Sequence, residues 1–547
     1  MVMKKLNWIR WIWILFLTVQ IVPAQERPDR EIHYRYGDWI SYPVMRFVTS
    51  IALGQQTIYF GTTGGISRYQ FVKNLWDYPF TVSDGLENDA IRVVSYDFNT
   101  GILWCSTNAG LSYWISGVEE WRNISYESLS TGPVSSIGIG DQYTWIESSE
   151  RIYQGDRYGI HFSDATIEEA IEDHVQWSGH LTNGDEKYLP DLFAEDGYLF
   201  RSDGYIIDSE LRQFQIVETV QDEFNHLWLA TWGLGGAAAD VRTDYLTLLP
   251  YGLYSSDVRA MAWDGEKMWL GGHHLSEATG GITQWDVEND EWIYFEAEYL
   301  SQLRSDEVNA IAIDTSSVWF GTMDGLVRYD KKKDAWRSFS VYDALWDNRI
   351  YSIDLEDTVL WVGTELGINQ ISLPGMIVRQ VRDERLIHRR IYQLEVDGHD
   401  VWAGTDRGIY RYTGEREEWV YVPGYPGMLV QNVTAISRFN HEVWFATDDG
   451  VQVFDKNNDQ WIGFPADHFS IDRRINAIAA DSTVVWVGTD NGVLKYNKAE
   501  NRWRRFTTED GLLDNSVNWI LLDGDYIWFG TNRGLTRFYW NAPYRND

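Results

Sequence analysis

The sequence predicts an all-β protein built from repeated four-stranded antiparallel sheets. One pattern recurs along most of the 547 residues: an apolar residue and Trp, then Gly-Thr, two variable residues, Gly and a second apolar run. Turns rich in Gly, Asn and Asp separate these short runs, which is typical of β-hairpins. No 3.6-residue periodicity runs through the repeats, so helical repeat architectures are excluded.

The repeat is clearest in the C-terminal half and weakens toward the N-terminus. The clearest copies lie at 318–329, 401–412, 485–496 and 527–538. Weaker copies extend the series to twelve units, and in one of them Leu199 replaces the aromatic residue. The last six units are about 42 residues apart, the spacing of repeat proteins whose units each add one small sheet.

One unit shows how four strands are made. Its expected strands are Ile475–Ala480, Val484–Thr489, Val493–Tyr496 and Trp503–Phe506. The second strand is apolar on both faces, so both faces must be buried against neighbouring sheets. The small Gly488 would let the next sheet approach closely. A four-stranded unit of this length, repeated radially, is a propeller blade. We therefore predict a β-propeller fold of about 12 four-stranded blades.

The two ends of the chain complement each other. The last unit stops after its third strand, near Trp540, while the N-terminal stretch Gly37–Tyr42 looks like a spare fourth strand. We predict that this N-terminal strand closes the last blade, which would remove an exposed sheet edge.

Twelve blades exceed the four to eight usual in one ring, which favours two propellers. The expected division places residues 25–160 with 400–547 in the first propeller and 161–399 in a second, inserted one. Two irregular stretches suggest these crossings: 155–190, with a short helix expected at 166–173, and 372–390, which lacks the usual fourth strand. One continuous ring of residues 25–547 is the alternative.

The first 24 residues resemble a secretory signal peptide. Lys4, Lys5 and Arg10 precede or begin an apolar run, and Val22-Pro23-Ala24 supplies small residues for cleavage. The run is shorter than the roughly 20 residues of a spanning helix, although a membrane anchor is the alternative. We expect a periplasmic or secreted protein without membrane insertion after cleavage. Cys105 is the only cysteine, so no intramolecular disulfide can form.

Charge and motifs exclude several functions. The formal net charge is −35, which argues against a nucleic acid partner; simple solubility also explains it. No nucleophile elbow, P-loop or zinc motif is present, and the acidic turns lack EF-hand spacing. We therefore predict no enzyme activity, no cofactor and no metal. A lyase or hydrolase with scattered catalytic residues is the alternative.

Residues 486–515 resemble the two-component regulator propeller family. The matching positions are Trp486, Gly488, Thr489, Gly492, Tyr496, Trp503, Phe506, Thr507, Asp510, Gly511, Leu512 and Asn515. Residues 76–88 repeat the second half, ending in Asp84, Gly85, Leu86 and Asn88. The resemblance implies an exported propeller of the kind that recognises polysaccharide fragments or serves envelope assembly. This chain carries no kinase segment, so the resemblance implies a separate signalling or secretion partner.

Arginines recur at one position, just before the first strand of a unit. Arg349, Arg390 and Arg474 occupy it, and Arg385 and Arg473 add to the set. In so acidic a chain they predict a cationic rim for an anionic ligand such as a uronate-containing glycan, because guanidinium groups bind carboxylates bidentately. Pairing with nearby Asp347, Asp383, Glu384 and Asp472 is the alternative.

Two other features are candidate ligand contacts. His273 and His274 lie in an expanded loop and could bind a metal or transfer protons, although an ordinary polar loop is the alternative. Trp232 and Trp346 lie in expected loops and could stack on sugars, although most Trp residues belong to the core.

These features predict an exported, non-enzymatic binding protein for a glycan, neutral or anionic, or for an envelope protein. The alternatives are a structural scaffold of an envelope or secretion complex and a polysaccharide lyase or hydrolase. A glycan binder requires exposed aromatic residues on the loop face, a scaffold requires a large apolar patch, and an enzyme requires His, Glu or Tyr converging at the channel mouth.

Overall fold

The computed structural model describes residues 34–158, 161–179, 189–194, 197–273, 280–425, 432–462 and 474–545. In this part of the chain the strands form eleven sheets, nine of them four-stranded. The helices are short: α1 (Tyr126–Leu129), α2 (Ile167–Glu172) and two 3-10 turns, η1 (Val82–Asp84) and η2 (Val341–Asp343). The prediction of an all-β chain of four-stranded antiparallel sheets is confirmed, as is the short helix near 166–173. The predicted signal peptide, residues 1–24, lies outside the described residues.

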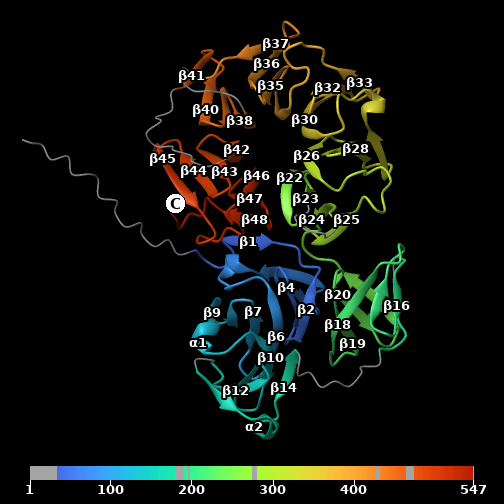
Figure 1. Cartoon of the computed structure of the whole chain (residues 1–547), viewed down its shortest axis with the longest axis vertical. Coiled ribbons are helices and arrows are strands. Elements are labelled where there is room, and N and C mark those ends of the chain that lie inside the picture. Colours follow the sequence, from blue (N-terminus) through green and yellow to red (C-terminus); the bar gives the residue numbers. More distant parts are fainter. Residues whose placement is uncertain are drawn as a thin grey trace, which may run out of the picture.

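Seven sheets form a closed series, which we call the ring. They are β22–β25 (Asp257–Trp263, Lys267–His273, Ile282–Asp286, Glu291–Phe295), β26–β29 (Val308–Ile313, Ser317–Thr322, Gly325–Asp330, Ala335–Phe339), β30–β33 (Ile350–Glu356, Val359–Thr364, Gly367–Ser372, Ile377–Gln380), β34–β37 (Ile391–Asp397, Asp400–Thr405, Gly408–Thr413, Glu418–Val422), β38–β41 (Val433–Phe439, Glu442–Thr447, Gly450–Asp455, Gln460–Ile462), β42–β45 (Ile475–Ala480, Val484–Thr489, Gly492–Asn497, Arg502–Phe506) and β46–β48 with β1 (Val517–Asp523, Tyr526–Thr531, Gly534–Tyr539, Trp39–Tyr42). Their first strands line the centre of the upper part of Figure 1.

Contacts between first strands close the ring. Each first strand contacts the next from β22 to β46, and β46 contacts β22 in turn. At this closure the Asn518 side chain donates a hydrogen bond to Asp257 Oδ1 at 2.7 Å. The ring of sheets is therefore closed by residues that are distant in the sequence, and each first strand of the ring has a neighbouring first strand on both sides.

Close packing between sheets depends on the Gly of the repeat. A Cβ built on Gly488 would lie 2.9 Å from Val517 Cγ1 in the next sheet. The same relation joins the last sheet to the first, where a Cβ on Gly530 would lie 2.9 Å from Val258 Cγ1. These distances are too short for a real side chain, so the prediction that Gly488 allows a close approach is confirmed.

The N-terminal unit contains the other four sheets. They are β2–β5 (Val48–Leu53, Thr57–Thr62, Gly65–Gln70, Leu75–Phe80), β6–β9 (Ile91–Asp97, Ile102–Thr107, Gly110–Ile115, Glu120–Ser125), β10–β14 (Val134–Ile139, Thr144–Ser148, Arg151–Gly155, Phe162–Ala165, Gln176–Gly179) and β15–β21 (Phe193–Ala194, Leu199–Arg201, Tyr205–Ile207, Gln213–Gln221, His226–Thr231, Gly235–Asp240, Tyr245–Leu249). Strand β18 contacts β2, β2 contacts β6, and β6 contacts β10. The unit forms the lower part of Figure 1.

Two sheets of this unit differ from the predicted pattern. Strand β14 adds to the inner edge of β10. The weak repeat at 198–207 makes β16 and β17, which pair with each other and with β18 in the seven-stranded sheet. That repeat is therefore not a sheet of its own.

The stretch 372–390 of the ring, expected to lack a fourth strand, supplies β33 instead. The strand reads Ile-Val-Arg-Gln and lacks the Trp and Phe that mark other fourth strands such as β45.

The expected boundaries near 160 and 400 fall inside sheets. The first separates β12 from β13, which pair with each other. The second separates β34 from β35, which also pair. Neighbouring sheets contact each other on both sides of residue 400. The sheets thus continue across both expected boundaries.

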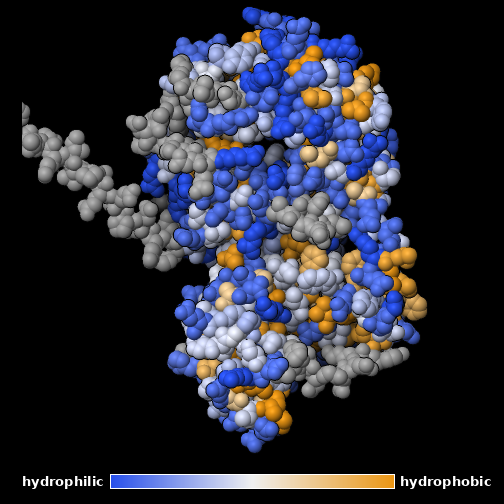
Figure 2. Space-filling view, in the orientation of Figure 1, coloured by the Kyte–Doolittle hydropathy of each residue, from blue (hydrophilic) through white to orange (hydrophobic). Residues whose placement is uncertain are grey.

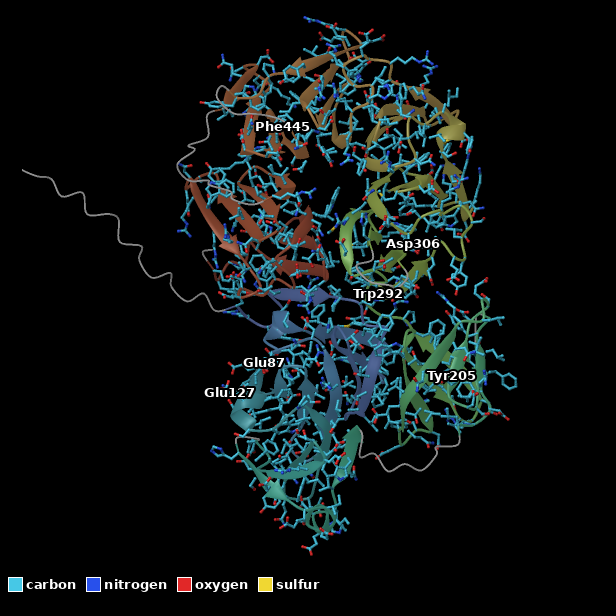
Figure 3. All side chains as sticks on the ribbon, viewed as in Figure 1. Glu87, Glu127, Tyr205, Trp292, Asp306 and Phe445 are labelled. Carbon is cyan, nitrogen blue, oxygen red and sulfur yellow. The ribbon has the colours of Figure 1, made fainter. Side chains whose placement is uncertain are left out.

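The N-terminal strand closes the last sheet of the ring, as predicted. Strand β1 pairs antiparallel with β48, with Trp39 opposite Phe538 and Tyr42 opposite Leu535. The chain then continues from β1 into the N-terminal unit, so β1 also links the two parts (Figure 1). Aromatic side chains fill the junction: Tyr251 stacks on Trp76 with centroids 4.4 Å apart and contacts Trp292, which Figure 3 labels.

The Thr-x-x-Asp-Gly-Leu motif is a turn that satisfies its own backbone. In η1 the Thr81 N–H donates to Asp84 Oδ2 at 3.0 Å, and the Thr81 hydroxyl accepts from Ser83 N–H. Gly85 follows with a φ of 94°, a conformation that favours glycine. Leu86 is buried. The Thr81 and Asp84 side chains thus form hydrogen bonds within the turn itself.

The structure corrects one residue of this motif. The Asn515 side chain accepts a hydrogen bond from Thr508 N–H at 2.9 Å. In the first copy Asp89, and not the predicted Asn88, has this role, because its Oδ1 accepts from Val82 N–H at 2.7 Å. A carboxylate replaces the amide here, and it pairs with Arg533 of the ring at 2.9 Å.

Candidate functional site at the mouth of the ring

Two kinds of residue meet at one end of the ring, which we call the mouth. They are the residues just before each first strand and those in the turn after each second strand. The Glu365 N–H donates to the carbonyl of Arg349 at 3.1 Å, and the Asp406 N–H donates to the carbonyl of Arg390 at 3.2 Å. The repeat therefore brings these side chains together at the mouth, as expected from the sequence.

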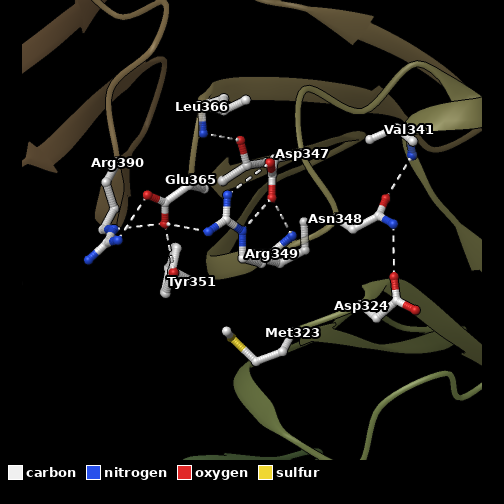
Figure 4. Close-up of polar contacts among 12 residues, drawn as sticks. Met323, Asp324, Val341, Asp347, Asn348, Arg349, Tyr351, Glu365, Leu366 and Arg390 are labelled. Atoms are coloured by element: carbon white, nitrogen blue, oxygen red, sulfur yellow. Dashed lines mark hydrogen bonds and ion pairs between the residues drawn. The ribbon is translucent and has the colours of Figure 1, made fainter.

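An ion-paired cluster occupies one side of the mouth (Figure 4). Glu365 binds Arg390 with both carboxylate oxygens, each 2.8 Å from a guanidinium nitrogen. The Tyr351 hydroxyl donates to Glu365 Oε2 at 2.8 Å. Arg349 lies 3.8 Å from the same carboxylate and binds Asp347 at 2.9 Å. Two arginines and two carboxylates thus hold one another in fixed positions.

The cluster keeps its groups in their usual charge states. Burial would raise the pKa of Glu365, but hydrogen bonds from Arg390 and Tyr351 outweigh it and lower that pKa below its ordinary value. Burial and the bond to Glu365 raise the pKa of Tyr351 to about 12. A general acid or base works best with a pKa near the working pH, and neither group meets this condition.

Arg474, the third arginine at the repeated position, belongs to another sheet of the ring. Arg474 is exposed and precedes β42, while Arg473 lies outside the described residues. Arg385 binds Asp383 at 2.7 Å. The pairing of Arg349 and Arg385 with their predicted acidic neighbours is therefore observed. Glu365 was missed, because it is a variable residue of the Gly-Thr turn and its partner Arg390 belongs to the next unit.

The predicted histidines form no metal site among the residues that the structure describes. His273 Nε2 lies 2.7 Å from Asn309 Oδ1, a side chain on the first strand of the next sheet. His274 lies outside the described residues. In the described part of the chain, no group of three or more metal-ligating side chains comes together.

The aromatic candidates have different surroundings. Trp232 is 46% exposed but belongs to the N-terminal unit, where its ring packs on Phe47 at 5.2 Å. Trp346 is half-buried against Gly367, at the turn that carries Glu365. Tyr342 of η2 is 91% exposed. The N–H of the preceding residue, Val341, donates to Asn348 Oδ1, and Asn348 directly precedes Arg349 in the chain. Tyr342 is not among the aromatic residues predicted from the sequence, although its place inside a capped turn indicates exposure.

This chain is similar to several known structures. PorZ, an essential surface component of the type-IX secretion system of Porphyromonas gingivalis, has a TM-score of 0.54 and 12% identity, over 92% of this chain and 87% of that chain. The extracellular domain of the hybrid two-component system BT3049 from B. thetaiotaomicron has a TM-score of 0.45 and 18% identity, over 94% of this chain and 76% of that chain. At these identities the likeness to PorZ shows the fold alone. The sequence matches no protein-family model and no curated protein.

Proposed function

We propose that this chain is an exported, non-enzymatic propeller protein that binds a glycan at the mouth of the ring. The observation that carries the proposal is the Arg390–Glu365–Tyr351 cluster. It presents guanidinium donors, carboxylate acceptors and a phenol in a rigid, nearly neutral arrangement. Sugar hydroxyls both donate and accept hydrogen bonds, so such an arrangement fits them.

The pairing favours a neutral glycan over an anionic one. Arg349 and Arg390 each have a carboxylate within ion-pair distance, so little positive charge is left for an acidic sugar. The exposed ring of Tyr342 could stack on a sugar face at the same end of the ring. The anionic ligand considered from the sequence would need these pairs to break.

The proposal of a non-enzymatic role rests on the same geometry. Glu and Tyr do converge at the mouth, as an enzyme would require, but the pKa of Glu365 is lowered and that of Tyr351 is raised. With the two pKa values shifted in these directions, neither group readily gains or loses a proton near neutral pH.

The division into propellers and the export of the chain also belong to this proposal. We assign the ring, residues 257–539 with β1, to one propeller and the N-terminal unit, residues 48–249, to a second. This assignment replaces the boundaries expected from the sequence. The N-terminal segment with its signal-peptide pattern supports export, and no helix among the described residues is long and apolar enough to span a membrane. The repeat motif supports membership of the two-component regulator propeller family.

A glycan-binding panel tests the function. The purified chain is titrated with neutral and acidic polysaccharides, followed by Trp fluorescence. We expect salt-insensitive binding to a neutral glycan, lost in Arg390→Ala and Tyr342→Ala. The matched control is Arg416→Ala, because Arg416 pairs with Glu418 on the same sheet in the turn at the opposite end. Binding that survives Arg390→Ala would contradict the proposal.

A protein partner is the second candidate, favoured by one surface. The sheet β15–β21 and its turns carry a set of exposed apolar side chains: Phe193, Leu199, Leu211, Val217, Phe224 and Tyr245. Figure 2 shows apolar colour gathered over the lower part of the molecule. Exposed apolar side chains gathered on one sheet are typical of an interaction surface. If no glycan binds, Leu211→Glu with Phe224→Glu should abolish capture of a defined envelope protein while leaving the fold intact.

A further inference from the structure

The two copies of the Thr-x-x-Asp-Gly-Leu turn line one cavity, at the junction of the ring and the N-terminal unit. The first copy contributes residues 82–85 and the second residues 508–511, although they lie near opposite ends of the chain. Strand β1 passes between the two parts here (Figure 1). The volume of the cavity is about 370 Å³, within the range of small-molecule sites.

Contacts with β1 hold both turns in place. The hydroxyl oxygens of Ser83 in η1 and Ser41 in β1 lie 2.6 Å apart, within hydrogen-bond distance. In the second turn Gly511 packs against Trp39 of β1 so closely that a Cβ would lie 2.6 Å from Trp39 Cγ. The two walls of the cavity, one from each part of the chain, are therefore fixed relative to β1.

The lining of the cavity is strongly acidic. Its charged side chains are five carboxylates and one guanidinium: Asp84, Glu119, Glu120, Glu509, Asp510 and Arg35. Glu119 belongs to the N-terminal unit and Glu509 to the ring, so both walls carry negative charge. Within the described ranges, neither of these two exposed side chains takes part in an ion pair. A cation would therefore be attracted into the cavity.

The carboxylates are spread too widely for a metal ion. A divalent metal ion takes several oxygen ligands, all within about 2.6 Å. In the part of the chain that the structure describes, no three metal-ligating side chains come together. The acidic residues instead come from η1, from the turn before β9 and from the turn after β45. This arrangement favours an organic cation.

Two indole groups of the lining carry a donor without an acceptor. Trp39 is 2% exposed and Trp121 is 8% exposed, and neither Nε1 atom has a hydrogen-bond partner among the described residues. By contrast, Trp528 in the same sheet as Trp39 donates from Nε1 to Asp523 at 3.2 Å. A buried N–H without an acceptor is unfavourable. The hydroxyl oxygens of a ligand would supply the acceptors that these two groups lack.

We propose that this cavity binds a cationic amino sugar, a ligand separate from the neutral glycan assigned to the mouth. The ammonium group pairs with the carboxylates of the walls. The sugar hydroxyls accept from the indole N–H groups and donate to the remaining carboxylate oxygens. The rings of the lining supply a surface for the sugar ring: Tyr34, Tyr36, Trp39 and Trp121. A simple diamine has the charge but no acceptor for the indoles.

Calorimetric titration of the purified chain with glucosamine, glucose and putrescine tests the proposal. We expect protonated glucosamine to bind at least about tenfold tighter than glucose, which lacks the charge, and than putrescine, which lacks the hydroxyl groups. Glucosamine should also raise the unfolding temperature, because a ligand that binds only the folded state stabilises it. Glu119→Gln and Glu509→Gln, one on each wall, should each weaken glucosamine binding about tenfold. Both residues are exposed, so these variants should fold normally.

The matched control is Glu417→Gln, which should leave glucosamine affinity unchanged. Glu417 directly precedes β37 as Glu119 directly precedes β9, and the two residues have nearly the same φ, 53° and 54°. Trp121→Phe keeps an aromatic ring but removes the N–H, so it should also weaken glucosamine binding. Absence of glucosamine binding, equal binding of glucosamine and either glucose or putrescine, or equal losses in Glu119→Gln and Glu417→Gln would overturn the proposal.

Discussion

The indole of Trp39 lies flat on the ring of Phe538, with centroids 3.8 Å apart and an interplanar angle of 10°. The two residues face each other in the β1–β48 pair, so this contact joins the N-terminal strand to the C-terminal one. Trp39 is buried and also contacts Phe506 and Phe529. One side chain thus completes both the last sheet and its packing against the preceding sheet.

Trp39→Ala should therefore destabilise the ring strongly. Removing a buried indole leaves a cavity and loses its transfer free energy, which together cost about 3–5 kcal/mol. Urea unfolding followed by circular dichroism measures this loss. Trp232→Ala is the control, because Trp232 is half-exposed and should cost far less. Equal losses in the two variants would mean that β1 does not close the ring.

The Asp89–Arg533 pair should matter for the junction between the two parts. Asp89 is 1% exposed and its carboxylate lies 2.9 Å from Arg533. Arg533→Met leaves this buried carboxylate without its charged partner, which should cost about 3 kcal/mol. The double variant with Asp89→Asn should recover most of the loss. Chemical unfolding of wild type, the two single variants and the double variant measures the coupling between Asp89 and Arg533. Additive effects of the two substitutions on the free energy of unfolding would contradict this coupling.

Asp89 should also make stability depend on pH. Burial raises the pKa of Asp89 from 3.8 to about 6, although Arg533 opposes the shift. The carboxyl group of Asp89 therefore holds its proton more tightly in the folded chain than in the unfolded chain. The protonated Asp89 contributes fully to the free energy of unfolding below about pH 4. This contribution, up to about 3 kcal/mol, is lost as the pH rises through about 6. Unfolding free energies of wild type and Asp89→Asn between pH 4 and 7 should diverge in this way, and parallel curves would refute it.

Gly488 should tolerate only the smallest side chain. A Cβ at this position already approaches Val517 Cγ1 within 2.9 Å. Gly488→Val should cost about 1–3 kcal/mol or more through overpacking. Gly488→Ala should cost less, because Ala446 occupies the equivalent position in β38–β41 and is buried there. Thermal unfolding ranks the two variants; a reversed order would show that the sheets are not packed as described.

Glu365→Gln should change the charge preference of the mouth. The substitution removes the carboxylate that Arg390 binds through both oxygens. With Arg349 and Arg390 less neutralised, salt-sensitive binding to acidic glycans should appear that wild type lacks. Titrations at low and high salt measure it. Glu418→Gln, at the start of β37 and the opposite end of the ring, is the control and should bind no acidic glycan.

The sequence by itself determined the elements of this protein. Strand identity and the turns between strands depend on neighbours within one unit, so residues such as Trp486 and Gly488 predict them. The closure of the last sheet was also predictable, because the spare strand at Trp39 and the missing strand after Trp540 are complementary patterns.

Only the tertiary structure decided the order of contacts and the pairing of charges. Ring closure rests on Asn518 and Asp257, which are 261 residues apart. The partner of Arg390 is Glu365, 25 residues earlier and in another sheet. Repeated units carry the same local signals, so the sequence alone cannot tell which sheet follows which. Those choices depend on side-chain contacts between sheets, which form only when the ring closes.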